Sequence, residues 1–85
     1  MNDEEILQEL EKIAERLEVA IRYENGDFKG GLCRIKENSC IIIQKRVPVE
    51  RKIFFLAREL SKFDLSAMYI IPQLRDLLQK EAEPF

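Results

Sequence analysis

Apolar residues recur every three or four positions near the start of the chain, which predicts an amphipathic helix. The apolar positions are Ile6, Leu7, Leu10, Ile13, Ala14 and Leu17. Asn2 and Glu5 have the spacing of a capping box, in which each side chain accepts a hydrogen bond from the other residue's backbone N–H. We therefore expect a helix over about residues 3–18.

The period of the pattern then changes from three or four to two. Apolar and polar residues alternate over residues 19–24, as in a strand with one buried face. Two further strands are expected over about residues 32–36 and 40–46, joined by a hairpin. The consecutive residues Ile41, Ile42 and Ile43 predict that the last strand is covered on both faces.

The hairpin also predicts how the two cysteines lie. A two-residue turn at Glu37-Asn38 would set Cys33 opposite Ile42 and Cys40 opposite Ile35. The two sulfurs would then lie diagonally, which is a poor geometry for a disulfide. We expect two buried thiols in a reducing compartment.

Prolines mark the start of two more helices, because a proline at the first helical position loses no hydrogen bond. Pro48 opens a helix over about residues 48–63, and Pro72 opens one over about residues 72–82. The first of these has the apolar stripe Ile53, Phe54, Leu56, Ala57, Leu60 and Phe63. The order of elements predicts a single α+β domain over residues 1–85, with helices on one face of a three-stranded, mainly antiparallel sheet.

Composition narrows the chemistry of the chain. The 85 residues include no histidine and two cysteines, which excludes most zinc sites and all histidine-based acid/base catalysis. The acidic start lacks the basic and apolar regions of a signal peptide, and no apolar run is long enough to span a bilayer. We expect a cytoplasmic protein with no metal, no cofactor and no membrane contact.

One segment matches a known pattern in its order of elements and in part of its sequence. A strand ending Ile41-Ile42-Ile43-Gln44 is followed by a proline-containing link, Arg51, and the helix Phe54-Phe55-Leu56-Ala57-Arg58-Glu59-Leu60-Ser61-Lys62. The stretch from Gly31 to Asp64 that contains this segment, about 35 of the 85 residues, resembles the core of the ImmA/IrrE-type metallopeptidases of the zincin superfamily. In that family a strand ending Ile-x-Ile-Asn precedes an arginine and the helix Phe-Thr-Leu-Ala-His-Glu-Leu-Gly-His.

The resemblance implies a metal site that has degenerated. Arg58 and Lys62 stand where the family has its two zinc-binding histidines, and Glu59 stands where it has the glutamate that activates metal-bound water. An arginine has no acceptor lone pair, and a lysine would have to lose its proton, at a cost of about 5 kcal/mol at pH 7. We therefore expect no catalytic residue, no bound metal and no enzyme activity.

Two interpretations remain for these three degenerate-site positions. Glu59 and Lys62 are three residues apart on one helix, which favours an ordinary ion pair. Alternatively, Arg58 and Lys62 line a charged recess that binds an anionic group. A metal-free enzyme built on Glu59 has no nucleophile with a paired base to support it.

The charges are unevenly distributed although their total is close to balance, with 14 basic and 16 acidic residues. Residues 1–18 are acidic and residues 19–62 are basic. Within the basic middle segment, the candidate anion-binding residues are Lys45, Arg46, Arg51 and Lys52. They suggest phosphate or nucleic-acid binding as an alternative function, but the near-neutral total and the absence of a known nucleic-acid motif argue against a nucleic-acid partner.

A domain this small has little core to cover its apolar residues. The apolar segment 68–71 and the first helix are therefore candidate surfaces for a homodimer or for an unidentified protein partner. Together these observations predict a small cytoplasmic protein that acts as a non-catalytic structural or protein-interaction module.

Overall fold

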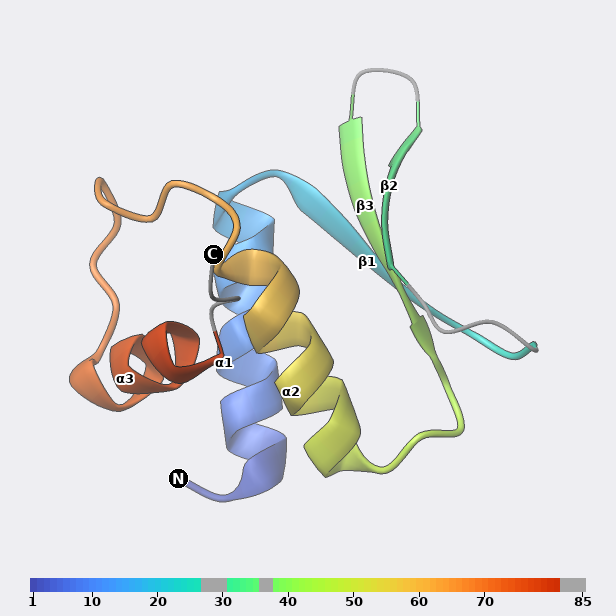
Figure 1. Cartoon of the computed structure of the whole chain (residues 1–85), viewed down its shortest axis with the longest axis horizontal. Coiled ribbons are helices and arrows are strands. Elements are labelled where there is room, and N and C mark those ends of the chain that lie inside the picture. The colour runs from blue at the N-terminus through green and yellow to red at the C-terminus, as the bar shows by residue number, and fades with distance from the viewer. Residues whose placement is uncertain (27–30, 36–37, 82–85) are drawn as a thin grey trace.

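The computed structural model describes residues 1–26, 31–35 and 38–81, with the backbone alone for residues 31–35 and 38. The elements are α1 (Asp3–Arg16), β1 (Val19–Glu24), β2 (Gly31–Ile35), β3 (Asn38–Gln44), α2 (Val49–Leu60) and α3 (Pro72–Lys80). Helices α1 and α2 lie side by side on one side of the sheet, and α3 packs against α2 on the side away from the strands (Figure 1).

The sheet is mixed, so the predicted mainly antiparallel arrangement is wrong. Strand β3 lies in the centre, in the order β1-β3-β2. β1 runs parallel to β3, with Val19 beside Ser39 and Glu24 beside Gln44. Only β2 pairs with β3 in the antiparallel sense.

The physical reason for this topology is the apolar character of β3. Cys40 and Ile41 are consecutive and therefore point to opposite faces of the sheet, yet their exposed fractions are 2% and 0%. A strand buried on both faces belongs in the middle of a sheet. β2 therefore pairs along the far edge of β3, and the short link after β1 does not make a hairpin between β1 and β2.

The predicted diagonal placement of the cysteines is also wrong. Ile35 pairs with Asn38, and Cys33 is the direct backbone partner of Cys40. The pairing differs because β2 ends at Ile35 and β3 begins at Asn38, each one residue before the position that a turn at Glu37-Asn38 requires. Residues 36 and 37 and the side chain of Cys33 lie outside the part of the chain that the structure describes, and the Cys40 side chain is buried.

Helix α1 begins as predicted and ends two residues early. The capping box forms, since the Glu5 N–H donates to Asn2 Oδ1 at 2.8 Å and the Asn2 N–H donates to Glu5 Oε1 at 3.3 Å. Glu18 has a φ of 61°, in the left-handed region that ends a helix. This residue turns the chain from α1 directly into β1.

β1 spans the predicted residues and α3 begins at the predicted Pro72, whereas the remaining boundaries differ from the predicted ones by one to three residues. α2 ends at Leu60 and α3 at Lys80, so both helices are shorter than their apolar patterns suggest. Pro48 is the N-cap of α2, and its carbonyl accepts hydrogen bonds from the N–H groups of Arg51 and Lys52 at 3.0 and 3.1 Å. β2 and β3 begin one or two residues before the predicted strands.

The hydrophobic core lies between the helical layer and the sheet. Its completely buried large side chains are Leu10, Ile41, Leu56 and Leu60. They come from α1, β3 and α2, so these three elements share one core. Within the described ranges, no helix combines the length and the apolar character that crossing a bilayer requires.

Candidate functional site

Glu59 is the one buried charged residue in the described part of the chain, with an exposed fraction of 7%. Its Oε2 lies 2.8 Å from the Nζ of Lys62, so the ion pair predicted from their spacing forms. The Lys62 side chain is 44% exposed, and solvent therefore reaches the ammonium. The pair satisfies the carboxylate, which is consequently not a free base facing an open cleft.

Arg58 lies in a different environment from this ion pair. It is exposed and lines a cleft between α2 and the end of β3, whereas Glu59 and Lys62 do not line that cleft. The sequence left open whether Arg58 and Lys62 together line a charged recess. Arg58 lines this cleft and Lys62 does not, so the two cations do not share it. Arg51 shares the cleft with Arg58 instead.

This cleft, which we call the α2 groove, has a volume of about 580 Å³. Its lining residues are Ile43, Gln44, Val47, Arg51, Phe54, Phe55 and Arg58. The four α2 residues follow the spacing i, i+3, i+4, i+7, which places them along one helix face. The groove is thus a strip of two phenylalanines with an arginine at each end.

Phe54 is 48% exposed, although the sequence pattern assigned it to the core. The core-facing stripe of α2 is already complete with Ile53, Leu56, Ala57 and Leu60, which have the same i, i+3, i+4, i+7 spacing. Phe54 lies beside this stripe on the helix surface. The two arginines seven residues apart, with two phenylalanines between them, were the signal in the sequence for this second face.

The four predicted anion-binding residues are not brought together. Arg51 lines the α2 groove, while the Nζ of Lys52 lies 5.3 Å from the centre of the Tyr23 ring. Lys45 and Arg46 are exposed in the link before α2. The four residues therefore lie in three different environments, and phosphate or nucleic-acid binding stays a prediction from the sequence.

Tyr23 connects the sheet with both helices beside it. Its hydroxyl donates a hydrogen bond to Glu11 of α1, and Lys52 of α2 lies over its ring. Burial raises the pKa of Tyr23, and the hydrogen bond to Glu11 and the charge of that carboxylate raise it further. The phenol is therefore held neutral, which fits a structural contact and not an acid or base.

The degenerate-site positions do not fit a zincin metal ion. Arg58 and Lys62 present cationic groups, and Glu59 is already paired with one of them. Among residues 1–26, 31–35 and 38–81, no three histidine, cysteine, aspartate or glutamate residues gather into a cluster that could hold a metal. This chemistry offers no donor set for the ion that the resembled family uses.

Comparison with known proteins adds no family assignment. No family model, no curated protein and no solved structure matches the chain. The resemblance to the ImmA/IrrE-type metallopeptidases accordingly stays a prediction from the sequence.

Proposed function

We propose that this chain is a non-catalytic, cytoplasmic protein-interaction module that binds an acidic peptide segment with an apolar anchor in the α2 groove. The observation that carries the proposal is a half-exposed Phe54 set between Arg51 and Arg58. Aromatic residues and arginine are enriched where protein interfaces derive most of their binding energy. A partner of opposite charge that covers this groove would remove its apolar surface from water and would pair with its arginines.

The spacing of the two arginines defines the partner further. Seven helical residues separate Arg51 from Arg58, which is about 10 Å along the axis. A peptide in the extended polyproline-II conformation rises about 3.1 Å per residue with three residues per turn, so two of its carboxylates three residues apart lie on one face and span about 9 Å. Apolar side chains between the two acids would then cover Phe54, while each arginine would bind a carboxylate through paired N–H donors.

The state of Glu59 supports the non-catalytic part of the proposal. Its carboxylate is buried and paired with Lys62 at 2.8 Å, outside the α2 groove. On this view the chain keeps the helix of a zincin-like core and uses a neighbouring face of that helix for binding.

A second copy of the chain is a weaker candidate for the occupant of the groove. The acidic residues of α1 have the right charge, but the apolar face of α1 is used in its own core, where Leu10 and Ala14 are 0% exposed. The α1 surface of a folded copy therefore offers carboxylates without an exposed apolar anchor on the same helix for Phe54 and Phe55. A separate protein with an extended acidic and apolar segment satisfies both requirements.

A binding titration tests the proposal. The probe is a fluorescein-labelled peptide containing Glu-Leu-Phe-Glu between Gly-Ser flanks, and fluorescence anisotropy reports its binding to the full chain. We expect the double variant Arg51→Glu/Arg58→Glu to bind at least about tenfold more weakly, because each arginine makes a charge-assisted contact. The matched control is Lys45→Glu/Arg46→Glu, which changes the charge equally outside the groove and should leave binding within about twofold, the residual effect of net charge.

Two results would overturn the proposal. One is a peptide with both glutamates replaced by glutamine that binds as tightly as the acidic peptide. The other is a concentration-dependent dimer, seen by sedimentation, that Phe54→Glu abolishes, since the groove would then belong to a second copy of the chain.

A further inference from the structure

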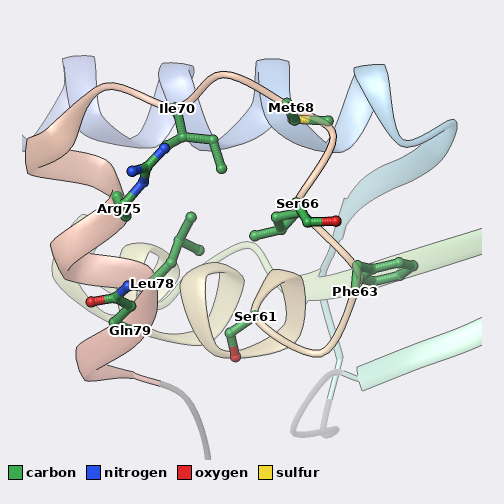
Figure 2. Close-up of a pocket in the computed structure, with 9 residues that line it drawn as sticks. Ser61, Phe63, Ser66, Met68, Ile70, Arg75, Leu78 and Gln79 are labelled. Atoms are coloured by element: carbon green, nitrogen blue, oxygen red, sulfur yellow. The ribbon is translucent and has the colours of Figure 1, made fainter.

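A second cleft lies at the C-terminal end of α2, where the loop of residues 61–71 connects α2 to α3 (Figure 2). Its volume is about 420 Å³. The apolar part of the lining consists of Phe63, Leu65, Met68, Ile70 and Leu78. The polar part consists of Ser61, Ser66, Arg75 and Gln79, and none of these nine residues lines the α2 groove.

The two serines of this cleft are already engaged. Ser61 Oγ donates to the carbonyl oxygen of Arg58 at 2.7 Å, and Ser66 Oγ donates to Asp64 Oδ1 at 2.7 Å. The Arg75 side chain, by contrast, makes no hydrogen bond or ion pair with any residue in the described part of the chain. The guanidinium extends from α3 toward Ile70 at one end of the cleft, and Leu78 points into the space beside it (Figure 2).

The loop that forms the outer wall has its own internal hydrogen bonds. Asp64 Oδ1 accepts from the N–H of Ser66 at 3.0 Å as well as from its hydroxyl, and the Met68 N–H donates to the Leu65 carbonyl at 3.1 Å. The hydrogen bonds from Ser66 lower the pKa of Asp64, so this carboxylate stays ionised and keeps the turn closed. The wall is therefore formed before any ligand arrives, which reduces the ordering that binding would require.

We infer that the cleft between this loop and α3 binds an amphipathic monocarboxylate, with the carboxylate on Arg75 and the apolar body against Leu65, Met68 and Leu78. One planar guanidinium matches one carboxylate through two parallel N–H donors. The five apolar side chains would make no favourable contact with a fully polar anion such as inorganic phosphate. The volume lies toward the lower end of the range for small-molecule sites, which suits a medium-chain fatty acid or a compound of similar size.

The probe is decanoate, titrated below its micelle concentration into the ¹⁵N-labelled full chain at pH 7 and followed by NMR. We expect saturable shifts at the amides of Met68, Ile70 and Leu78 and at the Arg75 side chain. Decanol has the chain without the charge and acetate has the charge without the chain, so both should bind at least about tenfold more weakly than decanoate.

Two variants on the same helix separate a specific site from general apolar adsorption. Arg75→Gln should weaken decanoate binding about tenfold, and Lys80→Gln, which removes an exposed cation outside the lining, should leave it unchanged. Amide spectra in the absence of ligand verify that both variants fold. Equal binding of decanol and decanoate, or shifts centred on the exposed side chains of Tyr69 and Ile71, would overturn the inference. Binding that Arg51→Glu/Arg58→Glu abolishes would also overturn it, because the ligand would then occupy the α2 groove.

Discussion

Helices α1 and α2 lie in the same layer and share one core, yet they distribute apolar and charged side chains differently (Figure 1). In α1 the buried residues are all apolar: Leu10, Ile13 and Ala14. In α2 a carboxylate, Glu59, is buried and a phenylalanine, Phe54, is half exposed. Departures from the expected pattern tend to concentrate where a fold also serves a function. The comparison therefore assigns α1 a stabilising role and places the proposed binding surface on α2.

The largest expected effect contrasts a core residue of α1 with the surface phenylalanine of α2. Leu10→Ala should lower the free energy of unfolding by about 3 kcal/mol, because it leaves a cavity at a completely buried position. Phe54→Ala should lower it by less than about 1 kcal/mol, because nearly half of its side chain is already in water. Urea denaturation measures both. Equal losses would make Phe54 a structural residue and remove the main support for the α2 groove as a binding surface.

The next effect compares two ion pairs with the same i,i+3 spacing. Lys62→Met should cost about 1–2 kcal/mol, since it leaves the buried Glu59 carboxylate without this partner. Lys12→Met breaks the exposed Glu9–Lys12 pair of α1, whose atoms are 3.2 Å apart, and should cost less than about 0.5 kcal/mol.

A double variant sharpens this result. Glu59→Leu combined with Lys62→Met should recover most of the stability lost in Lys62→Met alone, because no buried charge remains unpaired. If the double variant is no more stable than Lys62→Met, the ion pair is not what makes Lys62 important.

A smaller and opposite effect is expected at the end of α1. Glu18→Gly should raise the free energy of unfolding by up to about 1 kcal/mol, because its φ of 61° is one that glycine adopts without strain from a Cβ atom. Thermal unfolding measures the change, and Glu15→Gly in the helix interior is the control that should destabilise. A loss of stability in Glu18→Gly would show that its side chain contributes more than the backbone strain costs.

The smallest effect concerns Tyr23, which contacts Glu11 of α1 and Lys52 of α2. The pKa of Tyr23 is higher in the folded chain than in the unfolded chain, so the stability that its neutral form provides is complete below about pH 10 and falls as the pH rises toward the folded pKa. Tyr23→Phe should reduce the loss of stability between about pH 9 and 11, as measured by urea denaturation at each pH. Tyr69→Phe, at a side chain that is 74% exposed, should leave the alkaline slope unchanged.

The secondary structure could be predicted from the sequence because each element has a strong local signal. The alternation over Val19–Glu24 defines β1 to the residue, and Asn2 with Glu5 defines the start of α1. Sheet order could not be predicted in this way, because alternation determines which face a side chain occupies and not which strand lies alongside. The parallel pairing of β1 with β3 depends on contacts between residues about 20 positions apart.

The two candidate sites also differ in how far the sequence could predict them. The Glu59–Lys62 pair follows from helical spacing alone, so it was predictable. The α2 groove also requires Gln44 at the end of β3 and Val47 in the link that follows. Only the folded chain brings these two residues beside α2. Phe54 was predicted to be a core residue, but the core-facing stripe of α2 is complete without it.

The central position of β3 has a consequence for how the chain acquires its structure during synthesis. β1 and β2 emerge from the ribosome first, but both find their hydrogen-bonding partner only in residues 38–44. Until then α1 has its cap but no sheet to pack on, and two unpaired strands are available to bind other chains. Assembly of the sheet should therefore be a single late event, and a chaperone that protects the nascent chain would act in the interval before residue 44 appears.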